Sequence, residues 1–194
     1  MLRKTFVIIP IILLALSGCS SKSKDAAVTG AAPTVGAPAA PATTPADTST
    51  PQACPTAQTR KFAKTRFITN AGLAAGAFKR YIYSPYRSGA FNSGAKGRKR
   101  AIAKAAAAGL FTLDQLRRAK ANVQGDPTLC KMLAAPLAGL SATMKGMVDK
   151  LKHGNADPTS IGAASGALEQ TRGTAGSAGA GFKDKDVPAN MIGG

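Results

Sequence analysis

Apolar residues recur at helical spacing in four separate stretches of the chain. In the first, Phe67, Ala71, Ala74, Phe78 and Ile82 follow one another at intervals of three or four residues, so they share one face of a helix. Three later stretches repeat this spacing, and none shows the alternation of apolar and polar residues that is typical of a strand. The pattern predicts helices over about 57–83, 95–124, 127–153 and 157–182.

Short start and stop signals separate these helices. Ser84-Pro85 predicts the end of the first helix, because a residue that precedes proline disfavours the helical conformation. Asp126-Pro127 and Asp157-Pro158 each combine an N-cap residue with a proline suited to the first helical position. Since most joints are short, we expect neighbouring helices to alternate in direction. The sequence therefore predicts an all-α, antiparallel four-helix bundle.

Two glycines of the first helix, Gly72 and Gly76, lie four residues apart and so share one face. Their lack of side chains would let a neighbouring helix approach closely. The alternative is that both are merely tolerated, each at a cost of about 1 kcal/mol relative to alanine.

The first nineteen residues follow a different pattern. Arg3 and Lys4 precede an apolar run over 6–16, which has the length of a signal-peptide core and is too short to span a bilayer. The Leu-Ser-Gly-Cys sequence that ends at Cys19 resembles the lipobox of bacterial lipoprotein signal peptides. That resemblance implies removal of residues 1–18, a diacylglycerol on Cys19 and a lipid-anchored protein on the extracytoplasmic face of the cell membrane. The alternative is an ordinary secretory signal with an incidental cysteine.

The composition changes twice more along the chain. Residues up to 52 are mainly Ser, Ala, Pro, Thr and Gly, which cannot bury enough apolar surface to offset the entropy of ordering. We therefore predict a lipidated N-terminus and disordered linker over 19–52, and a basic helical domain over 53–182. Residues 183–194 carry little periodicity and are predicted to form a flexible tail.

The two remaining cysteines, Cys54 and Cys130, form an even pair in a protein predicted to be exported. In an up-down-up-down bundle, the residue before the first helix and the first turn of the third helix lie at the same end. A disulfide between the two is therefore predicted, with two free thiols as the alternative. Two cysteines without suitably spaced histidines do not make a zinc site, so no metal site is predicted.

The chain is strongly basic, with a net charge of +17. Twelve Lys and Arg residues and no Asp or Glu lie between Arg60 and Lys104. Such a segment attracts anionic lipid headgroups, phosphate-bearing wall polymers or nucleic acid, and predicted export argues against nucleic acid. The alternative is a solvated helical face that keeps the domain soluble.

All three tyrosines fall within six positions, flanked by arginines, at the joint between the first two predicted helices. Phenol rings and guanidinium groups together bind sugar faces and phosphates through stacking, cation–π contacts and hydrogen bonds. The alternative is that the rings plug one end of the bundle. The candidate anion-binding residues are Arg80, Tyr81, Tyr83, Tyr86, Arg87, Lys96, Arg98, Lys99 and Arg100.

The sequence contains no arrangement typical of a catalytic site. The H-E-x-x-H and G-x-S-x-G motifs are absent, and the single histidine, His153, falls where a helix C-terminus favours a cation. We therefore predict no enzymatic activity and no cofactor. The predicted function is binding of an anionic envelope component, either a wall polymer or phospholipid. The alternative is a scaffold lipoprotein that contacts a protein partner.

Overall fold

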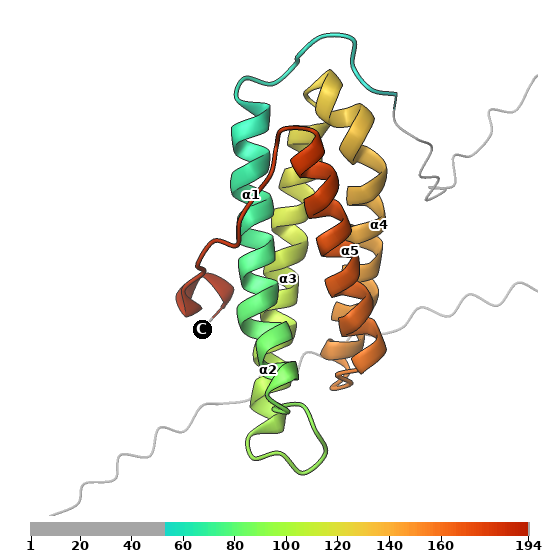
Figure 1. The fold of residues 1–194 in the computed structure, drawn as a ribbon. Coiled ribbons are helices and arrows are strands. Elements are labelled where there is room, and N and C mark those ends of the chain that lie inside the picture. The colour runs from blue at the N-terminus through green and yellow to red at the C-terminus, as the bar shows by residue number, and fades with distance from the viewer. Residues whose placement is uncertain (1–52, 194) are drawn as a thin grey trace, which may run out of the picture. The chain divides into compact units, whose positions relative to one another are not determined.

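The computed structural model describes residues 53–193, which fold into helices without a strand in that range (Figure 1). Three predictions lie outside the described residues: the signal peptide over 1–18, the lipidated Cys19 and the linker up to residue 52.

Four long helical segments make up the domain (Figure 1). The first is α1 (Ala63–Phe78), extended by a π-helical turn, η1 (Lys79–Tyr83), and a short helix, α2 (Ser84–Arg87). The others are α3 (Arg98–Val123), α4 (Pro127–Lys152) and α5 (Pro158–Ser177). A 3-10 turn, η2 (Ala189–Ile192), follows near the C-terminus. Helices that are consecutive along the chain pack side by side, α1 on α3, α3 on α4 and α4 on α5. The predicted antiparallel four-helix bundle is confirmed.

The apolar stripes form the core between these helices. All seven residues of the α4 stripe are buried, and so are the five apolar positions that predicted the first helix. Burying one such Leu or Phe side chain contributes about 1.5–3 kcal/mol. Helix α4 therefore stabilises the bundle through the large apolar side chains that it buries. The stripe of α4 consists of Leu129, Leu133, Leu137, Leu140, Met144, Val148 and Leu151.

The Asp-Pro pairs start two helices as predicted. The side chain of Asp126 accepts a hydrogen bond from the backbone N–H of Leu129 at 2.9 Å, and Pro127 begins α4. Asp157 accepts hydrogen bonds from the backbone N–H groups of Thr159 and Ser160 at the start of α5. Each aspartate satisfies amide groups that have no partner within the helix.

The predicted disulfide joins Cys54 and Cys130, whose Cα atoms are 5.6 Å apart. Cys54 precedes α1 and Cys130 lies in the first turn of α4, so the helix directions bring both to one end of the bundle. We call this the disulfide end. The opposite end, called the distal end, holds α2, the loop over 88–97 and the start of α3 (Figure 1).

The first helix differs from its predicted bounds of 57–83 at both ends. It begins at Ala63 because the backbone N–H groups of Thr59 and Arg60 donate instead to the carbonyl oxygen of Gly125. It also continues past Ser84, since Pro85 follows the π turn in the first turn of α2, where its missing N–H is tolerated. The second helix likewise begins at residue 98 rather than 95.

The C-terminal region departs most from prediction. Helix α5 ends at Ser177 rather than residue 182, and residues 183–193 do not form the predicted flexible tail. An extended segment crosses α1 instead (Figure 1), with Phe182, Val187 and Ile192 buried. Its buried apolar side chains and backbone contacts offset the entropy of ordering it.

The two glycines of α1 make room for this segment. The backbone N–H of Lys185 donates to the carbonyl oxygen of Gly72 at 2.9 Å. A Cβ atom placed on Gly76 would lie 1.7 Å from the carbonyl oxygen of Lys185. The two glycines do allow a close approach, but the neighbour is an extended stretch of backbone rather than the helix that was expected.

Candidate functional site

The predicted anion-binding residues fall into groups with different surroundings. The π turn η1 presents three consecutive side chains to the C-terminal segment. Lys79 forms an ion pair with Asp184 at 3.0 Å, Arg80 pairs with Asp186, and the hydroxyl of Tyr81 donates to the carbonyl oxygen of Val187 at 2.7 Å. Arg80 and Tyr81, two of the predicted binding residues, are thus engaged within the domain.

Tyr81 is also enclosed by cations. Its side chain is 6% exposed, and its ring lies 5.6 Å from the guanidinium carbon of Arg80 and 5.1 Å from Nζ of Lys104. The pKa of Arg80 is raised above its usual value by its hydrogen bond to Asp186, by the charge of that carboxylate and by Tyr81. The ring therefore has little surface left for stacking on a ligand.

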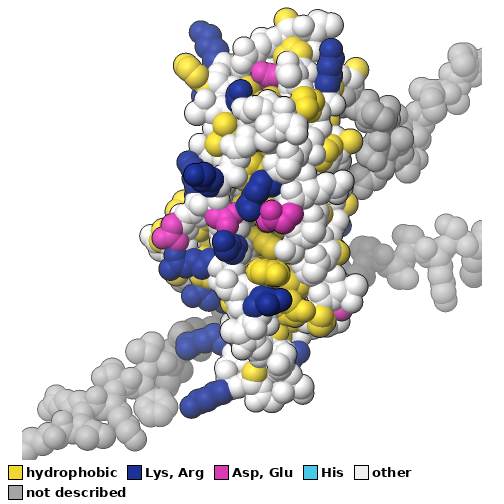
Figure 2. All heavy atoms as spheres, in the orientation of Figure 1, with side chains coloured by type: hydrophobic (Ala, Val, Ile, Leu, Met, Phe, Trp, Pro, Cys, Tyr) yellow, Lys and Arg dark blue, Asp and Glu magenta, His cyan; other side chains and the backbone are white. Residues whose placement is uncertain are grey.

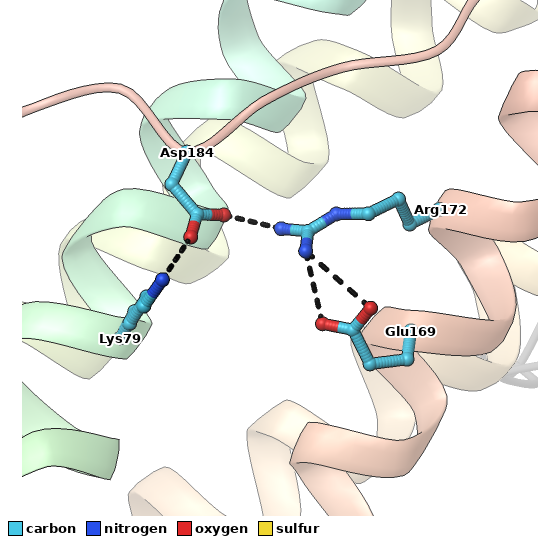
Figure 3. A network of polar contacts seen from close by, with 4 residues as sticks. All are labelled: Lys79, Glu169, Arg172 and Asp184. Carbon is cyan, nitrogen blue, oxygen red and sulfur yellow. Dashed lines mark hydrogen bonds and ion pairs between the residues drawn. The ribbon is translucent and has the colours of Figure 1, made fainter.

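A polar network fastens the same segment to α5 (Figure 3). Asp184 accepts from Arg172 as well as from Lys79, and Arg172 also pairs with Glu169 at 3.0 Å. Two cations and two carboxylates balance one another here. A cavity of about 90 Å³ adjoins the network, and this volume is well below that of a typical small-molecule site. These residues join the C-terminal segment to the bundle rather than forming an open site.

The other two tyrosines pack as a small aromatic group. The ring of Tyr83 stacks on Phe78 with centroids 6.1 Å apart and lies 6.4 Å from the ring of Tyr86. Both tyrosines are half-buried against the core. This arrangement agrees with the alternative that the aromatic residues plug the end of the bundle.

Four predicted residues remain free for a partner. Arg87, Lys96, Lys99 and Arg100, called here the distal cluster, are exposed and form no ion pair with any residue of 53–193. On the face shown in Figure 2, Lys and Arg side chains project from the lower end of the bundle, whereas most visible Asp and Glu side chains lie in a band across its middle. Arg98 differs because its Nε donates to the carbonyl oxygen of Phe91 at 2.8 Å and so holds the loop.

The distal cluster surrounds a helix terminus with unfavourable electrostatics. Helix α3 begins with Arg98, Lys99 and Arg100, and its first turn contains no acidic residue. Its N-cap, Gly97, has a φ of 77° and supplies no side-chain hydrogen bond. A helix N-terminus carries partial positive charge and unsatisfied N–H groups, so cations there repel it and anions are favoured.

A second basic region was missed by the sequence analysis. Arg60 and Arg66 near the start of α1 meet Arg118 and Asn122 near the end of α3, and together they line a groove of about 400 Å³. The groove is visible only once α1 and α3 are placed side by side, because its residues come from two sequence segments that are far apart in the chain. The one signal in the sequence was the basic stretch itself, which contains Arg60 and Arg66 but neither α3 residue.

Comparisons of this chain with protein-family models, with curated proteins and with solved structures give no match. Within residues 53–193, no three His, Cys, Asp or Glu side chains gather as ligands for a metal ion. No helix in this part of the chain combines the length and apolar character needed to cross a membrane.

Proposed function

We propose that this protein is exported, anchored by a lipid on Cys19, and binds an anionic component of the cell envelope through its distal cluster. The observation that carries the proposal is the gathering of unpaired, exposed cations around the uncapped start of α3. An anionic group bound there would neutralise the side chains and accept hydrogen bonds from the free N–H groups of the helix.

The energetics of α3 support a binding role for these cations. Each cation in the first turn of a helix opposes the helix dipole by about 0.3–1 kcal/mol at low ionic strength. Lys99 and Arg100 have no carboxylate partner among residues 53–193 that would offset this cost. Arrangements that oppose local stability are expected where a protein binds something.

The position of the distal cluster favours a wall polymer over the anchoring membrane. The cluster lies at the end of the bundle opposite Cys54, where the predicted linker enters the domain. If the linker leads to a lipid on Cys19, the cluster lies at the far end of the domain from the point where the linker enters, unless the long linker lets the domain fold back. A phosphate-bearing wall polymer is then the more accessible partner, and attraction to it is weakened by salt.

The proposal is tested by co-sedimentation with purified cell wall and with anionic vesicles at low and high salt. A variant that carries Lys96→Gln, Lys99→Gln and Arg100→Gln should lose most of its low-salt binding to wall. The matched control carries Lys61→Gln, Lys131→Gln and Lys183→Gln, which removes equal charge from exposed positions elsewhere. Equal loss in both variants, or no binding of the unmodified protein at low salt, would contradict the proposal.

One observation favours the second candidate function, contact with a protein partner. A groove of about 430 Å³ between α4 and α5 is lined mainly by small or apolar residues, including Ala135, Pro136, Gly139 and Ala167. If neither wall nor vesicles bind, a Gly139→Arg substitution would test this groove, because a Cβ there meets nothing within 4 Å. Loss of a cross-linked protein partner in that variant would support the second candidate.

A further inference from the structure

A groove whose lining includes three arginines and two asparagines runs between α1 and α3 toward the disulfide end of the bundle. Helix α1 contributes Arg66, Thr69 and Asn70, while α3 contributes Arg118 and Asn122. Arg60, which precedes α1, completes the lining. The volume of about 400 Å³ is in the range of small-molecule sites and exceeds that of a single inorganic anion.

Backbone hydrogen bonds hold Arg60 in place at the edge of the groove. The backbone N–H groups of Thr59 and Arg60 donate to the carbonyl oxygen of Gly125 at 2.9 and 3.3 Å. The side-chain stem of Arg60 lies over Gly125, where a Cβ atom would come within 2.7 Å of Cβ and Cγ of the arginine. A side chain positioned in this way loses less entropy when it binds a ligand.

The other two arginines supply positive charge from either wall of the groove. Nε of Arg118 donates to a carboxylate oxygen of Asp114 at 2.7 Å, which orients the guanidinium group. Hydrogen bonds from Arg117 and Arg118 lower the pKa of Asp114, so its carboxylate stays charged. Arg60 and Arg66 form no ion pair within residues 53–193, and the groove therefore carries an excess of positive charge.

Asn122 adds an amide group to the lining of the groove. The residue is 4% exposed, so it lies deeper than the arginines at the groove rim. Beside it, the hydroxyl of Thr69 and the amide of Asn70 offer uncharged hydrogen-bonding groups, and Nζ of Lys185 lies 3.5 Å from that hydroxyl.

We propose that this groove binds a phosphate group carried on a sugar or glycerol unit. Guanidinium groups match phosphate oxygens through paired hydrogen bonds, and the side chains of three arginines line this groove. The amide and hydroxyl groups suit the hydroxyls of the attached polyol. This inference does not rest on the proposed function, because the distal cluster lies at the other end of the bundle and shares no residue with the groove.

Calorimetric titration of the purified protein with glycerol 3-phosphate, inorganic phosphate and glycerol tests the proposal. We expect glycerol 3-phosphate to bind more tightly than inorganic phosphate, and glycerol to show no heat of binding. Arg60→Gln and Arg66→Gln should each weaken binding at least about tenfold, as expected for loss of a charge-assisted hydrogen bond. Arg117→Gln is the matched control, since it removes a charge beside Arg118 from a side chain that does not line the groove.

Two further variants separate the possible outcomes. Asn122→Asp keeps the side-chain shape and adds a negative charge, so it should abolish binding. Thermal unfolding checks whether this variant folds. If it does not fold, the two arginine variants test whether the groove binds phosphate. The variant lacking the three distal charges should bind glycerol 3-phosphate normally. Equal weakening by Arg66→Gln and Arg117→Gln, or absence of any binding, would overturn the proposal. Equal affinity for inorganic phosphate and glycerol 3-phosphate would overturn its polyol part.

Discussion

The distal cluster and the groove between α1 and α3 are both basic, but their side chains are held in different ways. Lys96, Lys99 and Arg100 extend from a loop and a helix start without a partner among residues 53–193. In the groove, by contrast, Arg60 is fixed by backbone hydrogen bonds and Arg118 by Asp114. Loosely held charges suit a long polymer with many equivalent anions, whereas fixed charges suit one group of defined shape.

Removal of the disulfide should lower the free energy of unfolding more than any other change proposed here. It should also affect ligand binding by the groove and by the distal cluster differently. Cys54→Ser with Cys130→Ser opens a loop with a sequence separation of 76, which costs about 4 kcal/mol in the chain-entropy account. Chemical denaturation measures this loss. Because the segment before α1 loses its covalent anchor, Arg60 should be held less firmly and glycerol 3-phosphate should bind more weakly, while low-salt binding to cell wall persists. Unchanged binding of glycerol 3-phosphate would show that a firmly held Arg60 is not needed for binding in the groove.

Gly76→Ala should have the next largest effect, acting through the C-terminal segment. The added methyl group would collide with the carbonyl oxygen of Lys185, and overpacking of this kind costs about 1–3 kcal/mol. Hydrogen exchange should show faster opening of residues 183–193. The matched control is Gly146→Ala on α4, where nothing lies within 4 Å, and it should stabilise the protein by about 0.5–1 kcal/mol.

The same substitution bears on the distal cluster. If the segment leaves α1, Arg80 loses Asp186, and its charge becomes available in the turn that precedes α2. Low-salt binding to wall should then increase slightly in Gly76→Ala. Equal destabilisation by the two glycine substitutions would show that the close approach at Gly76 is not what holds the segment.

The free energy of unfolding at acid pH should depend on two carboxylates, Asp157 at the distal end and Asp114 beside the groove residue Arg118. Hydrogen bonds from Lys150 and Ser160 lower the pKa of Asp157 at the distal end, and Arg117 and Arg118 lower that of Asp114. A carboxylate with a lowered pKa in the folded state stabilises the protein above its unfolded pKa of about 3.9. That contribution is lost as the pH falls through the folded pKa.

We therefore expect stability to decline below about pH 4, and Asp157→Asn to make this decline shallower while leaving the cap intact. Denaturation at a series of pH values measures the change. Asp114→Asn should flatten the curve too, and it should also weaken glycerol 3-phosphate binding because it frees Arg118. A steeper acid decline in Asp157→Asn would contradict the account.

The fold was largely predictable because its information is local. Apolar spacing located the helices, the Asp-Pro pairs located two helix starts, and alternating helix direction identified the partner of Cys54. The C-terminal segment was not predictable in this way. Its order depends on Gly72, Gly76 and the π turn, which lie about a hundred residues earlier in the chain.

The candidate site was predictable only in part for the same reason. A run of charges predicted the distal cluster, but it could not reveal that Asp186 neutralises Arg80 or that Tyr81 is buried against Val187. The groove could not be predicted from the sequence, because its residues come from two segments that meet only in the folded structure. Asn122 in particular is an ordinary residue in the sequence and becomes notable only through its place in the lining of the groove.

The most direct test of the distal cluster as a binding surface is the unfolding free energy of Lys99→Glu, measured with and without purified wall polymer. Without polymer, an acidic residue in the first turn of α3 should stabilise the protein by about 0.3–1 kcal/mol. The added polymer should stabilise the unmodified protein but not this variant. Lys120→Glu, in the last turn of the same helix, is the matched control and should lose stability while keeping its response to polymer. A Lys99→Glu protein that is less stable alone, or that responds to polymer as the unmodified protein does, would contradict the account.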